Sequence, residues 1–237
     1  MIISVEGLDG VGKSSLVTKL SQTMQIPVIE KPIKFLLELT PRQSENIKEK
    51  IYGKYSADIQ AMYYLLGYLS ALEDGEKKDY IFDRGFLSTY YFSCCEENAK
   101  LFDVFANEYG FPEVTILLYA TKDTRVKRIQ SRNKKDKDLN KSRIYMDDYE
   151  KFFDAIQRYN IPHIAINTEH ITQEETCDLV LNILNLWRQG EEYKDFVLNT
   201  YRIDKLSQNG KISYLEQKEI LKNAFRNPEK AVERVKK

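Results

Sequence analysis

The stretch ISVEGLDGVGKSS occupies residues 3–15 and decides the fold. Within it, Gly7, Gly12, Lys13 and Ser14 meet the pattern G-x-x-x-x-G-K-[ST] of a phosphate-binding loop in full. A short apolar run precedes the pattern and a stretch with helical periodicity follows it, which is the context that the pattern requires. The sequence therefore predicts a P-loop, a turn whose backbone wraps the phosphates of a nucleoside triphosphate.

Each residue type in this loop has a physical task. Glycines let successive backbone N–H groups point at the phosphates, and the N-terminus of the following helix adds partial positive charge. We expect Lys13 to reach the terminal phosphates and the Ser14 hydroxyl to bind Mg²⁺. ATP and Mg²⁺ are therefore the expected cofactors. The residues expected to bind the triphosphate are Gly7, Gly10, Val11, Gly12, Lys13, Ser14 and Ser15.

Short apolar runs alternate with longer helical patterns along the chain. This alternation is typical of βαβ units, and runs that are almost continuously apolar are typical of buried parallel strands. Five such runs cover residues 2–5, 27–29, 80–82, 114–119 and 163–166. The sequence predicts an α/β fold in which helices flank a five-stranded parallel sheet.

Apolar residues at steps of three or four predict the helices. Such steps recur between residues 44 and 74, which indicates at least one long helix between the second and third strands. After Gly190 the composition becomes polar and then rich in Lys and Glu. We expect residues 1–189 to form the P-loop domain and residues 190–237 to form an appended helical hairpin. The other predicted helices cover residues 13–24, 98–109, 121–131, 145–159 and 172–188.

The composition excludes several classes of protein. Lys plus Arg and Asp plus Glu are equal at 36 each, so no global charge attracts the chain to nucleic acid or to an anionic membrane. Three cysteines cannot form a disulfide framework, and no Cys or His spacing resembles a zinc site. The chain lacks the pattern of a signal peptide, and no window reaches the length of a membrane span. We expect a cytoplasmic protein with a small-molecule partner, without membrane or nucleic-acid binding.

The stretch VEGLDGVGKSS resembles the opening of thymidylate kinases and their deoxynucleoside kinase relatives, in which the P-loop carries an acidic residue in its middle. Asp9 occupies that position here, and the resemblance implies that it lies toward the sugar of the acceptor. A second stretch, YIFDRGFLSTYYF at residues 80–92, is similar to the Asp-Arg-Tyr motif of the same family. Gly85 stands where the family usually has tyrosine.

Asp83 and Arg84 follow the third predicted strand directly. The carboxyl end of a parallel strand is where ligands of α/β proteins bind. We expect Asp83 to orient a water of Mg²⁺ and Arg84 to bind an acceptor phosphate or sugar. The alternative interpretation is an ion pair at the surface.

Residues 124–132 and the polar loop after them resemble the lid of this family, which corresponds to about residues 125–143. Arg128 and Arg132 are four residues apart and share one helical face. We expect them to stabilise charge on the transferred phosphoryl group, the alternative being a solvated basic face.

Asn167 follows the fifth strand and resembles the turn where the family holds the donor adenine.

The acceptor side leaves two enzymes open. Glu30 and Lys31 follow the second strand. If Glu30 is a general base toward a sugar hydroxyl, the substrate is a nucleoside, whereas a role of Lys31 in neutralising an acceptor phosphate indicates a monophosphate. Tyr64 and Tyr68 lie on the predicted long helix, where they either contact an acceptor base or belong to the core.

The sequence favours ATP-dependent phosphorylation of a deoxynucleoside monophosphate, with dTMP to dTDP as the leading hypothesis. A deoxynucleoside kinase acting on a 5′-hydroxyl is the enzymatic alternative, and a non-catalytic nucleotide-binding module is the third. The resemblance also implies a homodimer. The expected catalytic residues are Lys13, Asp9, Asp83, Arg84, Arg128 and Arg132, and the expected metal ligands are Ser14 and Asp83. The expected substrate-binding residues are Asp9, Glu30, Lys31, Tyr64, Tyr68 and Arg84.

Overall fold

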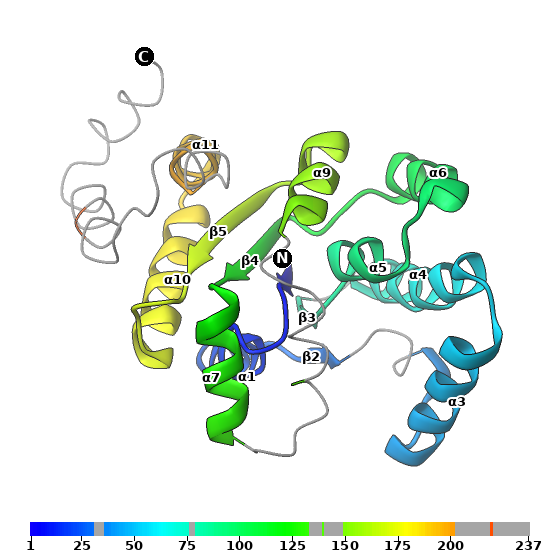
Figure 1. Ribbon diagram of the computed structural model, residues 1–237. Helices are drawn as coiled ribbons and strands as arrows, with labels where there is room; N and C mark the ends of the chain where they lie inside the picture. The colour runs from blue at the N-terminus through cyan, green and yellow to red at the C-terminus, as the bar shows by residue number, and fades with distance from the viewer. Residues whose placement is uncertain (31–35, 76–78, 133–138, 140–148, 202–218, 220–237) are drawn as a thin grey trace. The chain divides into compact units, whose positions relative to one another are not determined.

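The computed structural model describes residues 1–30, 36–75, 79–132, 139, 149–201 and 219. Strands in these ranges form one five-stranded sheet in the order β2-β3-β1-β4-β5 (Figure 1). Strand β3 pairs in parallel with both β1 and β2. The predicted α/β fold with a five-stranded parallel sheet is confirmed. The strands are β1 Ile2–Glu6, β2 Val28–Glu30, β3 Tyr80–Asp83, β4 Val114–Tyr119 and β5 His163–Asn167.

Helices occupy the segments between the strands and follow the last strand, most of them close to the predicted bounds. The region predicted to hold at least one long helix contains two, because the chain is extended at Tyr55 and interrupts the helical hydrogen bonds there. Of the helix predicted over residues 145–159, the part before residue 149 lies outside the described residues. The described helices are α1 Lys13–Met24, α3 Pro41–Lys54, α4 Ala57–Gly75, α5 Phe86–Ser93, α6 Ala99–Tyr109, α7 Lys122–Arg132, α9 Glu150–Tyr159, α10 Gln173–Trp187 and α11 Glu191–Thr200, with a 3-10 turn at Glu96–Asn98.

Helix α5 begins two residues after Arg84 and is a helix that the sequence analysis does not predict. Seven of its eight residues are buried. A helix buried on nearly all sides shows no alternation of apolar and polar residues, and that alternation is the signal that reveals the other helices. No helix in the described ranges is long and apolar enough to span a bilayer.

The chain divides into two compact units. The first comprises Met1–Gly7, Ser21–Thr115 and Asp148–Pro162, and the second comprises Leu8–Leu20, Ile116–Asp147 and His163–Lys237. The division falls inside the P-loop, between Gly7 and Leu8.

The first unit contains β1, β2 and β3, with Ile3 beside Ile81 and Glu30 beside Asp83 in the strand register. Helix α5 packs against both α4 and α9 (Figure 1). The ring of Phe86 lies at the centre of an aromatic cluster in this unit. Its ring centroid is 5.0–6.2 Å from those of Tyr90, Phe102, Phe105, Phe111 and Tyr159.

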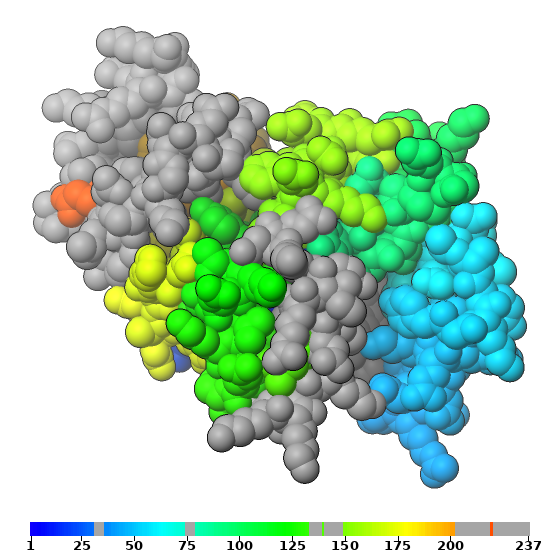
Figure 2. All heavy atoms as spheres, in the orientation of Figure 1, coloured from blue at the N-terminus to red at the C-terminus, as the bar shows by residue number. Residues whose placement is uncertain are grey.

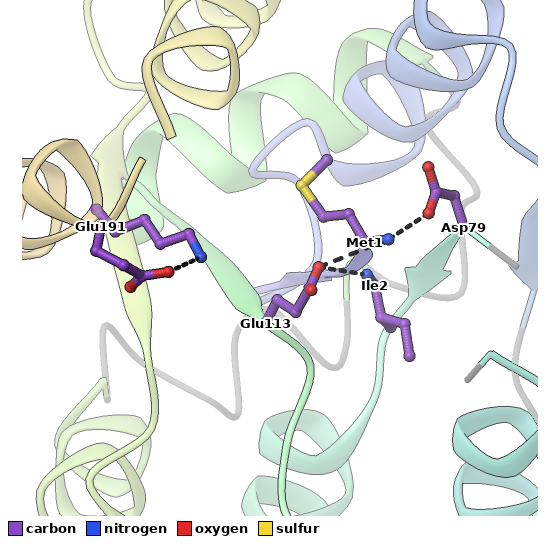
Figure 3. A network of polar contacts seen from close by, with 6 residues as sticks. Met1, Ile2, Asp79, Glu113 and Glu191 are labelled. Carbon is purple, nitrogen blue, oxygen red and sulfur yellow. Dashed lines mark hydrogen bonds and ion pairs between the residues drawn. The ribbon is translucent and has the colours of Figure 1, made fainter. Parts of the chain in front are cut away.

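The first residues of β1 are held by two carboxylates (Figure 3). The terminal amine of Met1 forms an ion pair with Asp79 and lies 3.6 Å from Glu113. The backbone N–H of Ile2 donates to the same Glu113 carboxylate at 3.1 Å. These contacts join the start of β1 to the segments that precede β3 and β4.

The second unit contains α7, β5, α10, α11 and the part of α1 up to Leu20. Helix α10 begins with a capping box, in which Thr172 and Glu175 each satisfy a backbone N–H of the other. Helix α11 lies beside α10 and β5, and the carbonyl oxygen of Tyr201 accepts a hydrogen bond from the backbone of Ala165 at 2.8 Å. The first part of the predicted appendage therefore packs on this unit. Its residues 202–218 and 220–237 lie outside the described residues.

Candidate active site

The P-loop joins β1 to α1, and Gly10 shows why its glycines are required. Gly10 has φ +87°, a left-handed conformation that side chains rarely adopt. A Cβ atom at this position would also lie 2.8 Å from the carbonyl oxygen of Arg125. The backbone of α7 therefore approaches the loop so closely that only glycine fits.

Lys13 and Ser14 begin α1, as the motif predicts. The buried Lys13 ammonium donates a hydrogen bond of 2.7 Å to the carbonyl oxygen of Leu8, across the loop. Ser14 is exposed at the first turn, and that turn contains no acidic residue. A cation beside an uncompensated helix N-terminus favours a bound polyanion.

Arg125 of α7 is a site residue that sequence reasoning missed. Its side chain is 1% exposed, and its Nη1 atom donates to the backbone oxygen of Asp9 at 3.4 Å. It forms the buried face of α7 together with Ile129, four residues later. In the sequence, the spacing of four residues between this arginine and the apolar Ile129 was the signal that could have revealed it. The Asp9 backbone is thus held by α7, and its half-buried side chain belongs to the loop itself.

The two predicted lid arginines have different surroundings. Arg128 donates from Nη1 to the Thr168 hydroxyl at 2.9 Å and from Nη2 to the Thr168 carbonyl. The Thr168 hydroxyl in turn donates to the carbonyl oxygen of Val11 in the P-loop at 3.2 Å. Arg132 is exposed at the end of α7, whose outer side forms part of the face seen in Figure 2. The rest of the predicted lid, apart from Leu139, lies outside the described residues.

The turn after β5 is connected to the start of α7. The Asn167 side chain accepts a hydrogen bond from the backbone of Glu169 at 2.9 Å. The Glu169 carboxylate accepts from the hydroxyls of Thr121 at 2.6 Å and Thr124 at 3.2 Å. The turn predicted to hold adenine is therefore fixed against the helix that carries the lid arginines.

In the first unit, Arg84 follows β3 with a strained backbone. Its φ of +75° is in the left-handed region, which is uncommon for residues other than glycine and is found at functional sites. Its Nη1 atom donates to the carbonyl oxygen of Gly7 at 3.2 Å, and the guanidinium lies 5.8 Å from the centre of the Phe92 ring. Asp83, half-buried, ends β3 beside the exposed Glu30, and Lys31 lies outside the described residues.

Glu6, the last residue of β1, is a second residue that sequence reasoning missed. Its side chain is buried, and its carboxylate accepts hydrogen bonds from Ser4, Gly85 and Ser88. Burial raises the pKa of Glu6, while these hydrogen bonds and the charge of Arg84 oppose the rise. A carboxylate at the end of an otherwise apolar strand was the signal that could have revealed it.

The two candidate tyrosines of α4 differ in burial. Tyr68 is 1% exposed and packs on Phe82 and Phe105, with each pair of ring centroids 5.7 Å apart. Its hydroxyl has no hydrogen-bond partner among the residues that the structure describes. Burial and the nearby Glu6 raise the pKa of Tyr68 well above its usual range. Tyr64 is half-buried, and burial also raises its pKa.

The described residues contain no group of three or more His, Cys, Asp or Glu side chains that would hold a metal by itself. Mg²⁺ is usually bound through one or two protein oxygens together with substrate phosphates. The exposed Ser14 hydroxyl at the start of α1 fits that mode of binding.

Comparison with known proteins identifies the domain type. A family model described as an AAA domain matches residues 2–165. No curated protein sequence matches the chain.

Several solved structures share the fold. A deoxyadenosine kinase from M. mycoides, with the products dCMP and dCDP bound, has a TM-score of 0.55 and 19% identity over 78% of this chain and 99% of that one. A thymidylate kinase from Candida albicans has a TM-score of 0.59 and 15% identity, over 80% and 93% of the two chains. The YorR protein from Bacillus subtilis, in complex with phosphorylated GDP, has a TM-score of 0.53 and 13% identity, over 81% and 99%. At these identities the likeness concerns the fold.

Proposed function

The chain belongs to the AAA domain family, and on that premise we propose that it catalyses ATP-dependent phosphorylation of a deoxynucleoside monophosphate, with dTMP as the acceptor. The kinase-like fold supports a phosphotransferase. The observation that carries the choice of a phosphate acceptor is Arg84. A strained backbone and a hydrogen bond to Gly7 hold this cation at the carboxyl end of β3, where α/β proteins bind ligands.

Residues of the second unit bind the phosphate donor in this proposal. Lys13 and the N-terminus of α1 bind the phosphates of ATP, and Arg128 and Arg132 are proposed to stabilise the charge of the transferred group. Bound Mg²⁺ would neutralise charge on the phosphates, and we propose the Ser14 hydroxyl of this unit as its ligand. Asn167 is proposed to contact the adenine.

Residues of the first unit bind the acceptor. Arg84 pairs with the phosphate of dTMP through charge-assisted hydrogen bonds. A phosphate oxygen of dTMP attacks the γ-phosphorus of ATP, the bond from that phosphorus to the bridging oxygen breaks, and ADP leaves. The attacking oxygen is already an anion, so the step needs no general base.

The test is an assay of ADP formation from ATP with dTMP, dCMP, dAMP and dGMP in turn. We expect dTMP to be phosphorylated and Arg84→Ala to raise its KM at least about tenfold, since a charge-assisted hydrogen bond contributes about 1.5–3 kcal/mol. Arg158→Ala is the matched control, because Arg158 is a cation of the same unit that pairs with Asp103 at the surface. It should leave KM unchanged. If no monophosphate is turned over, the proposal is wrong.

A second candidate, phosphorylation of a deoxynucleoside, is favoured by one observation. Glu30 and Asp83 are neighbours in the register of β2 and β3, so two carboxylates adjoin at this end of the sheet. One of them could accept the proton of a sugar 5′-hydroxyl, whereas two adjacent anions oppose the binding of a phosphate. Turnover of thymidine or deoxyadenosine, abolished by Glu30→Gln, would establish this candidate. Binding of ATP without turnover of any acceptor would instead indicate the non-catalytic module.

A further inference from the structure

The N-terminus of α5 is capped by a residue from a different element. The first backbone N–H groups of a helix lack partners within it, and the side chain of the N-cap residue usually accepts from one of them. Here the N-cap is Gly85, which has no side chain to do so. Glu6 at the end of β1 takes over this task. Its Oε1 atom accepts from the Gly85 N–H at 2.8 Å, and its Oε2 atom accepts from the Ser88 N–H at 3.2 Å.

Both oxygens of Glu6 are also bonded to serine hydroxyls. Ser4 lies 3.1 Å from Oε1, and the Ser88 hydroxyl lies 2.5 Å from Oε2. Each carboxylate oxygen therefore faces a backbone donor and a hydroxyl, an arrangement that suits an ionised, acceptor-only carboxylate. A neutral amide of the same shape would place an NH₂ group against a backbone N–H.

Position 85 cannot carry its own capping side chain. A Cβ atom there would lie 2.8 Å from Cε2 of Tyr68, 3.0 Å from the Ser4 hydroxyl and 3.3 Å from Oε1 of Glu6. The ring of Tyr68 and the Glu6 carboxylate thus occupy the space beside Gly85. Glycine at position 85 leaves room for the Glu6 carboxylate, and Glu6 in turn supplies the cap that a side chain at position 85 cannot supply.

Arg84 immediately precedes this cap. Its Nη1 atom lies 3.4 Å from the Ser88 hydroxyl, which also donates to Glu6, and 3.2 Å from the carbonyl oxygen of Gly7, the residue after Glu6. Its backbone N–H donates to Val5, the residue before Glu6, at 3.1 Å. Residues at the end of β1 therefore accept hydrogen bonds from both the backbone and the side chain of Arg84.

We propose that Glu6 is a positioning residue, which holds the guanidinium of Arg84 in place through the N-terminus of α5 and thereby sets the affinity for the acceptor. The second half of this inference rests on the proposed function. The first half concerns the conformation of Arg84 alone.

The test is Glu6→Gln in the full chain, assayed with ATP and dTMP. We expect KM for dTMP to rise about tenfold with KM for ATP within about twofold, because the unsatisfied donors shift α5 and Arg84. A double-mutant cycle decides whether Glu6 acts through Arg84. In an Arg84→Ala background, Glu6→Gln should change KM for dTMP by less than about twofold. An equal, additive effect in both backgrounds would overturn the proposal.

The matched control is Glu175→Gln, which changes a helix-capping glutamate in the second unit. Since glutamine also serves in a capping box, this variant should keep both KM values. If Glu6→Gln does not unfold cooperatively, Ser88→Ala replaces it, because Ser88 bonds to both Glu6 and Arg84. Its expected rise in KM for dTMP is about threefold, and an unchanged value would count against the proposal.

A readout without turnover separates this inference from the proposed function. In the ¹⁵N NMR spectrum, Glu6→Gln should shift the Nε–Hε signal of Arg84 and reduce the hydrogen-exchange protection of the Gly85 and Ser88 amides. If these changes occur while no acceptor is phosphorylated, the proposed function is wrong and the positioning of Arg84 by Glu6 stands. If the Arg84 signal is unchanged, the positioning role is wrong, whatever the enzyme acts on.

Discussion

At the residue scale, the chemistry of the loop depends on groups that lie far away in the sequence. Gly10 must be glycine because the backbone of Arg125 lies against it. Gly85 must be glycine because the ring of Tyr68 lies against it. Gly10 falls at a variable position of the P-loop pattern and Gly85 where the Asp-Arg-Tyr motif has tyrosine, so in both cases the contact rather than the motif explains the glycine. A substitution at either position would meet backbone or a buried ring rather than solvent.

Tyr68 has two possible roles, as a residue of the hydrophobic core or as a residue that binds the acceptor. A buried hydroxyl without a hydrogen bond costs about 1–3 kcal/mol. If Tyr68 belongs to the core, Tyr68→Phe should raise the free energy of unfolding in urea by about 1 kcal/mol and leave KM for dTMP unchanged. A raised KM would show instead that the hydroxyl binds the acceptor.

Tyr64→Phe is the comparison for this variant. The Tyr64 side chain is only half-buried, with its ring centroid 6.0 Å from that of Tyr52 on α3, so removal of its hydroxyl should not raise the stability.

At the scale of elements, capping determines where helices begin. Helix α3 begins at Pro41, ahead of its apolar pattern, because Thr40 and Gln43 form a capping box there, although no residue of this helix is buried. Helix α5 begins where a strand residue, Glu6, provides the cap. The cap of α3 is formed by residues close in sequence. The cap of α5 joins residues about 80 positions apart, so no local sequence pattern reveals it.

An ion pair between α6 and α9 gives this scale a pH-dependent prediction. Arg158 donates two hydrogen bonds to Asp103, at 2.9 and 2.7 Å, and these lower the pKa of Asp103. A carboxyl whose folded pKa is depressed stabilises the protein above its unfolded pKa, about 3.9, and this stabilisation disappears as the pH falls through the folded value. Both side chains are partly exposed, so we expect a contribution below about 1 kcal/mol.

The measurement is the urea unfolding of wild type and Asp103→Asn from pH 7 to pH 2. The difference in free energy should be present at pH 7 and vanish at the acid end, and it should shrink in 1 M salt. A difference that is independent of pH would show that the carboxylate charge contributes nothing.

At the scale of the whole molecule, α11 and the residue that follows it pack into the second unit. Phe196, Val197 and Tyr201 are buried, and the Tyr201 backbone bonds to β5. A chain of residues 1–201 keeps these contacts, whereas a chain of residues 1–189 loses them. Burial of three large side chains contributes on the order of 5 kcal/mol as an upper estimate.

We therefore expect the 1–189 chain to unfold at a clearly lower temperature than the 1–201 chain in a calorimetric scan, by at least about 5 °C. Equal unfolding temperatures would place the domain boundary at residue 189, as the composition suggests.

The sequence by itself determined the P-loop, the approximate bounds of the five strands and the α/β class, because these depend on local glycine spacing and on continuous apolar runs. It also placed Asp83 and Arg84 at the end of a strand. Only the tertiary structure decided that Glu6 caps α5, that Arg125 is buried against the P-loop and that Tyr68 fills the space beside Gly85. The reason is physical. Those roles arise from packing between elements distant in the chain. The periodicity of one element does not show which residues of another element will contact it.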